Sequence, residues 1–196
     1  RLIEISKSII IIYVVLSVLC SICYLSVGMA PFDALTHAMT TVSTGGFSTH
    51  DESLGYYQGW PVLWVAIVFM IAGALPFSFF IAIFFARNLP RYDPQIAVFF
   101  TLIILACALV LFVDGWDHTT NFTQFSQYIF NVIAILTTTG YASGNFMDYG
   151  GIGATLFFFL IFIGGCAGST SGGIKIYRFI VLSQLIRTSL QELMYS

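Results

Sequence analysis

Charged residues are scarce in this sequence, and their scarcity excludes a soluble globular protein. Only 8% of the 196 residues are Asp, Glu, Lys or Arg, whereas 58% are hydrophobic and 17% are aromatic. An ordinary soluble domain carries about a quarter charged residues. The composition therefore predicts an integral membrane protein. The formal net charge of −2 gives no reason to expect a nucleic-acid partner.

Residue types that carry catalysis or bind metals are also few. The three histidines show no ligand spacing, so we expect no metal site on them; they are His37, His50 and His118. All four cysteines lie in apolar runs, and the pair Cys20 and Cys23 has no nearby basic group that would activate a thiol. No Ser–His pair or pair of Asp residues lies within the apolar spans. We therefore expect neither an enzyme nor a resident cofactor.

Apolar stretches divide the chain into spans and shorter helices. Four of them are long enough to cross the roughly 30 Å core of a bilayer, at about 5–27, 61–86, 95–113 and 154–187. Two shorter helices, 32–42 and 123–136, are too short to cross. Pro76 predicts a kink in the second span. The glycine-rich run at 164–174 predicts a broken helix in the fourth, although tight packing of small residues is the alternative.

A loop rich in hydroxyls and glycine follows each short helix, at 43–48 and again about 95 residues later at 137–143. Irregular backbone at membrane depth is tolerated only where protein or a watery cavity covers it. Spaced recurrence indicates an internal repeat. We predict two units, 1–90 and 91–196, each with the order span, re-entrant helix, loop, span. A turn at the membrane surface is the alternative for either loop.

The distribution of charge supports re-entrant helices. If neither short helix crosses, all basic residues fall on one side and the opposite connections hold only acidic ones, which by the positive-inside rule places the amino end in the cytoplasm. The basic residues are Arg1, Lys7, Arg87, Arg91, Lys175, Arg178 and Arg187; the acidic ones are Asp33, Asp51, Glu52, Asp114, Asp117 and Asp148. Each unit then crosses twice, so the copies are parallel, as around a central pore.

Loops of this composition suit a dehydrated monovalent cation. A ring of backbone carbonyls can replace the ion's hydration shell without a fixed charge. Glycine tolerates the positive φ that points successive carbonyls inward. The short helices end at the loops, and their negative dipole ends favour a cation there. The acidic outer connections would concentrate cations before entry.

The two loops and the glycine-rich run together resemble the Trk/Ktr/HKT potassium-uptake family, most closely its bacterial TrkH/TrkG branch. The resemblance implies repeats two and three of an all-α, pseudo-four-fold architecture similar to potassium channels. It implies K+, with Rb+ as a possible substitute, bound by the backbone carbonyls of a filter formed by Ser43, Thr44, Gly45, Gly46, Thr138, Thr139, Gly140 and Tyr141. Gly45 and Gly140 match the filter glycines that favour potassium.

The same resemblance implies a gate beneath the filter and several partners. The gating loop would consist of Gly164, Gly165, Gly168, Ser169, Thr170, Ser171, Gly172, Gly173 and Lys175. For Lys175, a snorkelling anchor at the cytoplasmic surface is the alternative. The implied setting is the bacterial inner (plasma) membrane, with a homodimer and a cytosolic nucleotide-binding subunit of the TrkA type.

The chain starts at Arg1 and stops at Ser196, which favours an internal fragment whose parent supplies the remaining repeats. Two other functions stay open. A coupled secondary transporter would need basic residues near mid-membrane to bind an anionic substrate. A membrane-embedded assembly subunit would need no water access to the loops.

Overall fold

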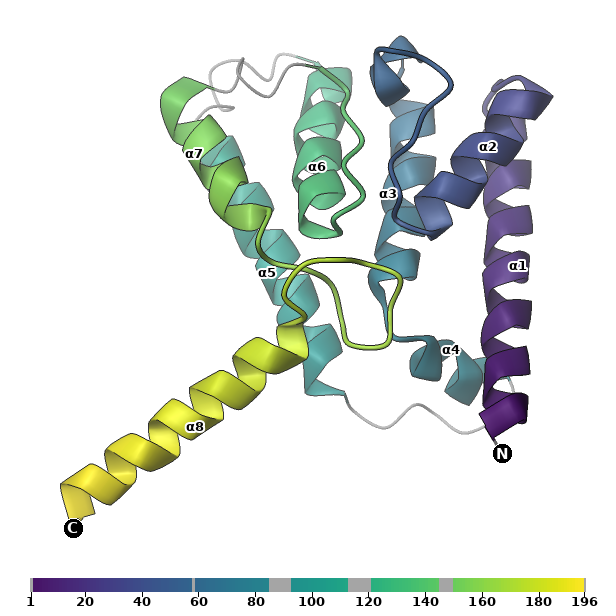
Figure 1. Cartoon of the computed structure of the whole chain (residues 1–196). Helices are drawn as coiled ribbons and strands as arrows, with labels where there is room; N and C mark the ends of the chain where they lie inside the picture. The colour runs from purple at the N-terminus through teal and green to yellow at the C-terminus, as the bar shows by residue number, and fades with distance from the viewer. Residues whose placement is uncertain (1, 58, 85–92, 113–120, 145–149, 196) are drawn as a thin grey trace.

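The computed structural model describes residues 2–57, 59–84, 93–112, 121–144 and 150–195, and these residues are predominantly helical (Figure 1). The helices are α1 (Leu2–Ser26), α2 (Pro31–Val42), the short 3-10 helix η1 (Ser53–Tyr56), α3 (Trp60–Ala74), α4 (Phe77–Phe84), α5 (Pro94–Val110), α6 (Phe122–Leu136), α7 (Gly150–Leu160) and α8 (Ile176–Tyr195). Within this part of the chain, strand-like pairing is limited to one isolated bridge between Ile163 and Ile174. The all-helical prediction is confirmed.

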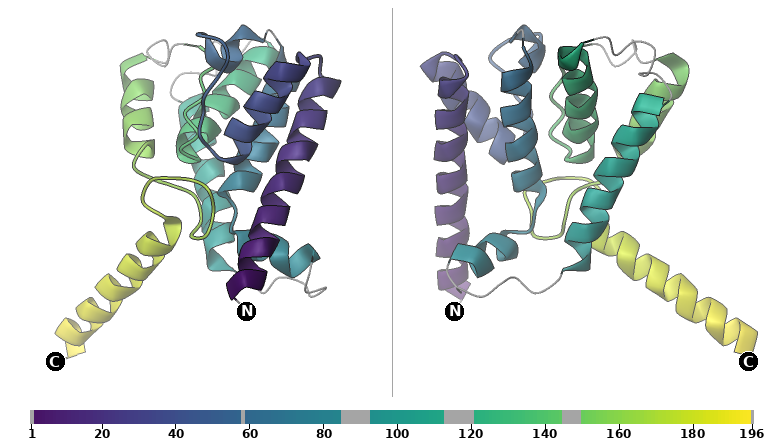
Figure 2. Two further views of the ribbon diagram at one scale, coloured as in Figure 1. Left: turned by 45° about the vertical axis from the view of Figure 1, so that its right-hand side comes forward. Right: turned by 180° about the vertical axis from the view of Figure 1, so that it is seen from behind.

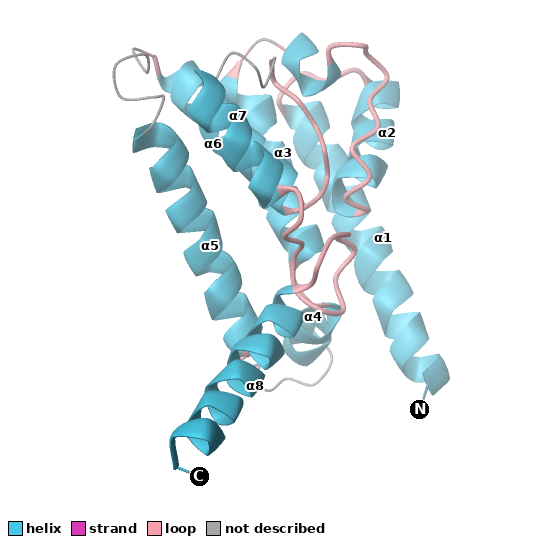
Figure 3. Cartoon of the chain, turned by 60° about the vertical axis from the view of Figure 1, so that its left-hand side comes forward, coloured by secondary structure: helices cyan, strands magenta, loops and turns pink. Residues whose placement is uncertain are grey.

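The two halves of the chain follow similar paths. α2 and α6 both start at the end of the molecule that is uppermost in Figure 1, and both stop about halfway along the longer helices. The first loop (residues 43–52) and the second loop (137–144) then return toward the end where these helices start. After α7, the third loop (161–175) passes beneath both, and α8 points away from the bundle. Figure 3 shows the three loops gathered between the helices.

The second span is interrupted rather than kinked. By length and composition α1 alone could cross a membrane among the described residues, whereas α3 and α4 pass that test only as a pair bent by 92°. Leu75 is extended, with φ −78° and ψ 154°, because a residue that precedes proline is sterically excluded from the helical region. The expected kink at Pro76 is therefore a complete break that leaves the last carbonyls of α3 without helical partners.

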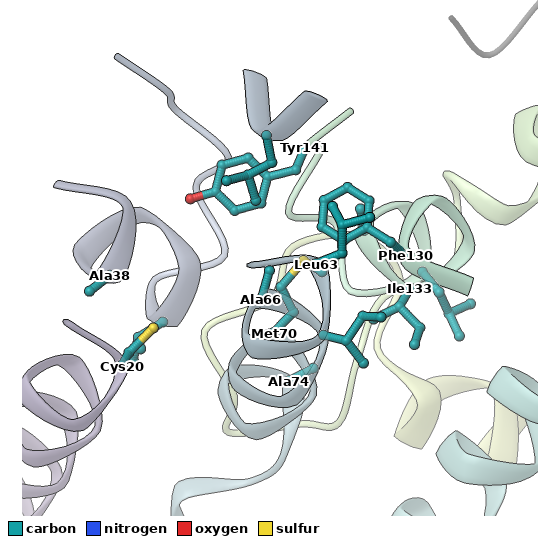
Figure 4. Close-up of a cluster of buried hydrophobic side chains, with 14 of the residues drawn as sticks. Cys20, Ala38, Leu63, Ala66, Met70, Ala74, Phe130, Ile133 and Tyr141 are labelled. Carbon is teal, nitrogen blue, oxygen red and sulfur yellow. The ribbon is translucent and has the colours of Figure 1, made fainter. Parts of the chain in front are cut away.

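The centre of the molecule is the interface between α3 and α6 (Figure 4). Buried side chains at helical spacing on α3, namely Leu63, Ala66, Met70 and Ala74, face Phe130 and Ile133 of α6. Small residues at this interface allow the two backbones to approach closely, as is common between membrane helices. This packing fixes the position at which the second loop begins, at the end of α6.

Parts of the predicted topology lie outside the described residues. They include the boundary at residues 90 and 91, both arginines of that connection, the connection at 113–120 with His118, and Asp148.

Candidate functional site

The first and second loops leave their helices through the same backbone motif. In the first loop, the amide of Thr44 donates to the carbonyl of Thr41 (3.1 Å) and the amide of Gly45 to that of Thr40 (2.8 Å). In the second, Thr138 and Thr139 make the equivalent bonds to Ile135 and Ala134, both 2.9 Å. This is the Schellman helix ending, which requires a left-handed residue just beyond the helix.

Threonine occupies the left-handed position in both loops, with φ +52° at Thr44 and +58° at Thr138. Two residues later each loop has a glycine with positive φ, +69° at Gly46 and +80° at Gly140. The structure therefore aligns Gly140 with Gly46. Gly45 is aligned with Thr139, one position earlier, and its assignment as a filter glycine stays a prediction.

The two loops touch through their backbones. A Cβ atom added at Gly46 would lie 1.9 Å from the carbonyl oxygen of Thr139, so only glycine fits there. Farther out, the amide of Gly55 donates to the carbonyl of Ala142 (3.1 Å). The hydroxyl of Ser53 accepts from the amide of Ala142 (3.3 Å). The predicted filter residues of the two halves are thus brought together.

Two buried polar side chains form hydrogen bonds to the later residues of the first and second loops. His37 Nε2 lies 2.9 Å from the hydroxyl of Ser48. Asn131 Oδ1 accepts from both the amide and the hydroxyl of Ser143, each at 3.1 Å. His37 and Asn131 occupy equivalent positions on α2 and α6. The sequence analysis assigned neither residue to the site; the available signal was that both occupy the same position of two short helices that precede similar loops.

The third loop fills the break in α3. Two backbone hydrogen bonds join the start of this loop to its end. The amide of Gly164 donates to the carbonyl of Ile174, and the amide of Ile174 donates to the carbonyl of Phe162, both at 3.0 Å. The amide of Cys166 donates to the carbonyl of Ala74 (3.0 Å), and the amide of Thr170 donates to the carbonyl of Gly73 (3.1 Å). The carbonyls released by Pro76 are therefore satisfied by a loop from the second half. Figure 2 shows this loop between the lower ends of α3 and α5.

The third loop also contacts the bases of the other two. The hydroxyl of Thr170 lies 2.9 Å from the carbonyl oxygen of Val42, the last residue of α2. The amide of Gly172 donates to the hydroxyl of Thr138 (2.6 Å). The ammonium of Lys175 donates to the carbonyl of Ser171 and lies 3.1 Å from its hydroxyl. A positive charge is thus held inside the third loop, directly beneath the predicted filter.

A small polar cluster lies at the outer start of α2. Asp33 accepts hydrogen bonds from the hydroxyls of Thr49 and Tyr57, both at 2.8 Å, and its carboxylate lies 3.2 Å from His50 Nε2. The bonds from Thr49 and Tyr57, followed by the contact with His50, hold the pKa of Asp33 below its usual range. Asp33 therefore stays ionised at the outer end of the first loop.

Two short helices that end in matched, touching loops, above a third loop that fills the break after α3, define an all-helical protein built from two similar helix–loop units. A family model described as TrkH, cation transport protein, matches residues 1–194. The chain belongs to this family of membrane transporters, which are not enzymes.

Relatives from several bacteria are similar over nearly the whole chain. The Trk system potassium uptake protein TrkI of Halomonas elongata is 39% identical over 98% of this chain and 39% of its own length. TrkH of Escherichia coli K12 is 32% identical over all of this chain and 41% of its own length. The crystal structure of the potassium transporter TrkH from Vibrio parahaemolyticus matches all of this chain and 43% of that one, with 34% identity and a TM-score of 0.89. The chain thus spans about two fifths of these relatives.

Proposed function

We propose that this chain forms the second and third of four pore repeats of a potassium-uptake transporter in the bacterial plasma membrane, with its amino end in the cytoplasm. Dehydrated K+ would pass along backbone carbonyls of the first and second loops, and Rb+ would substitute for it. The proposal accords with the names of the relatives, which are potassium uptake proteins, and with the share of their length, 39% and 41%, that the chain covers.

One observation carries this proposal: both loops repeat the same left-handed turn and place a positive-φ glycine at the same position. Positive φ at Gly46 and Gly140 would allow the carbonyls of neighbouring residues to point to one side of the chain. Backbone carbonyls aligned in this way can replace the hydration shell of a monovalent cation. Both helices also direct their negative dipole ends at the loops.

The third loop is proposed as the gate. The hydroxyl of Thr170 covers the carbonyl of Val42, at the end of α2, and the amide of Gly172 engages the hydroxyl of Thr138. A loop bonded to the base of both halves of the filter would occupy the exit path of an ion. The ammonium of Lys175, held against Ser171, would add electrostatic repulsion to this closed position.

The remaining repeats of the parent protein, a second copy of it and a cytosolic TrkA-type regulatory subunit would complete the assembly. Phe47 supports the presence of another repeat. It is 76% exposed, although the equivalent residue of the second loop, Tyr141, is fully buried against α2 of the preceding repeat. By the same geometry, the repeat that precedes this chain's first unit would cover Phe47.

The test is Rb+ uptake by cells that lack their own potassium transporters and express the full-length protein carrying this sequence. We expect saturable uptake, which Gly140→Ser weakens while Na+ becomes an effective competitor. Gly144→Ser is the matched control, since Gly144 is an exposed glycine of the same loop. If the unchanged protein reaches the membrane but takes up no Rb+, the transport proposal fails in favour of a membrane assembly subunit.

A further inference from the structure

Tyr141 was expected to contribute its backbone carbonyl to the ion path, and its side chain points away from the second loop and into the first half of the chain (Figure 4). Its ring is completely buried, and Phe130 of α6 stacks against it at a centroid distance of 6.5 Å. Its hydroxyl reaches α2, about one hundred residues earlier in the sequence. A side chain in this position cannot itself coordinate a passing ion.

The hydroxyl of Tyr141 is surrounded by oxygen atoms of α2. It lies 2.5 Å from Thr40 Oγ1, 3.1 Å from Thr41 Oγ1 and 3.2 Å from the carbonyl oxygen of His37. Thr40 Oγ1 in turn lies 2.8 Å from the carbonyl oxygen of Phe47, in the first loop. Tyr141 can therefore donate to Thr40, which donates its own proton to Phe47. We call these three groups the inter-loop tie.

We propose that Tyr141 is a positioning residue for ion selectivity, and that the inter-loop tie fixes the spacing between the first and second loops. This inference rests on the proposed function. Phe47 directly follows Gly46, and Tyr141 directly follows Gly140, so the tie joins the two loops immediately beside their positive-φ glycines. The absence of a side chain at Gly46 lets the two loops approach closely, and the tie joins them beside this contact.

Selectivity is sensitive to this spacing because carbonyls that are free to collapse inward accommodate a smaller ion. Removing the Tyr141 hydroxyl leaves the ring in place and releases one buried hydrogen bond. A bond of this kind contributes enough to change an equilibrium by about two- to tenfold. We therefore expect Tyr141→Phe to lower the preference for Rb+ over Na+ by about that factor.

The experiment measures Rb+ uptake and its inhibition by Na+ in the full-length protein, normalised to the amount in the membrane. Tyr24→Phe is the matched control, because Tyr24 is equally buried and its hydroxyl lies 2.9 Å from Thr41 Oγ1, but it contacts neither loop through that group. Thr40→Val removes the middle of the tie with little change in shape. We expect Thr40→Val to reproduce the effect of Tyr141→Phe, and the double variant to be no less selective than either single variant.

The outcomes separate the tie from the proposed function. Uptake with unchanged preference in both Tyr141→Phe and Thr40→Val would overturn the tie and leave the transport proposal standing. An equal loss of preference in Tyr24→Phe would also overturn it, because general loosening of α2 would then account for the effect. Absence of Rb+ uptake by the unchanged protein would overturn the transport proposal and the tie together.

Discussion

Replacing Thr170 with valine should open the proposed gate. The threonine hydroxyl lies 2.9 Å from the carbonyl oxygens of both Val42 and Gly73, and it has one proton to donate. Valine has nearly the same shape but no donor, so Val42 loses this bond while Gly73 keeps the amide of Thr170. A buried hydrogen bond has a net value of about 0.5–1.5 kcal/mol. Because 1.4 kcal/mol corresponds to a factor of ten, the ratio of open to closed loop should rise about two- to tenfold.

The assay is the initial rate of Rb+ uptake by the full-length protein, with Na+ competition measured in parallel. If the closed loop limits flux, Thr170→Val should raise the rate by the same factor and leave the preference for Rb+ over Na+ unchanged. Thr101→Val, on the exposed face of α5, is the control, because among the described residues its hydroxyl bonds only to Ala97 of its own helix. An unchanged or lower rate in Thr170→Val, at equal protein in the membrane, would refute the argument that this hydroxyl holds the loop closed.

Two further predictions concern stability. Gly46→Ala combines left-handed backbone strain with a clash against the carbonyl of Thr139, and should lower the free energy of unfolding by about 2–5 kcal/mol. The melting temperature of the solubilised Gly46→Ala variant should therefore lie well below that of Gly144→Ala. Equal melting temperatures would contradict the contact between the loops. The lowered pKa of Asp33 means that its charged form stabilises the fold above the usual value of 3.8 and that this contribution is lost as the pH falls through the lower folded value. The difference in melting temperature between the unchanged protein and Asp33→Asn should therefore begin to shrink below about pH 4, and a difference that is undiminished at pH 3 would argue against the cluster.

The starts and ends of the short helices were predictable because their signals are local. Pro31 occupies the first turn of α2, where a missing amide costs nothing. Hydroxyl and glycine residues follow both α2 and α6, where a helix that must stop inside the molecule needs a left-handed turn. The membership in a potassium-uptake family was also predictable, since the loops and the glycine-rich run together are specific to it.

The register of the first loop could not be predicted from residue preferences. Glycine favours positive φ, and a sequence with two adjacent glycines leaves open which of them matches the second loop. The structure places Thr44, a β-branched residue, in the left-handed position, which costs energy locally and is tolerated because Thr170 and Gly73 pack against it. Such contacts between distant segments are invisible in a single local window of sequence.

The complete break at Pro76 was underestimated for the same reason. A proline inside an apolar span predicts a kink when only its own helix is considered. The carbonyls that it frees at Gly73 and Ala74 would be costly in a membrane, so a full break becomes acceptable only when another segment supplies donors. The third loop, encoded about ninety residues later, supplies them.

The mutual capping of α3 and the third loop sets an order of events during synthesis. Thr170 lies 97 residues beyond Gly73. At a translation rate of roughly 5–20 residues per second, the broken end of α3 leaves the ribosome about 5–20 s before its cap exists. During that interval the nascent chain carries bare carbonyls that must be shielded by water, lipid headgroups or the insertion machinery. The first unit of this protein is therefore not a finished folding unit at the moment it is inserted, and it matures only when the second unit arrives.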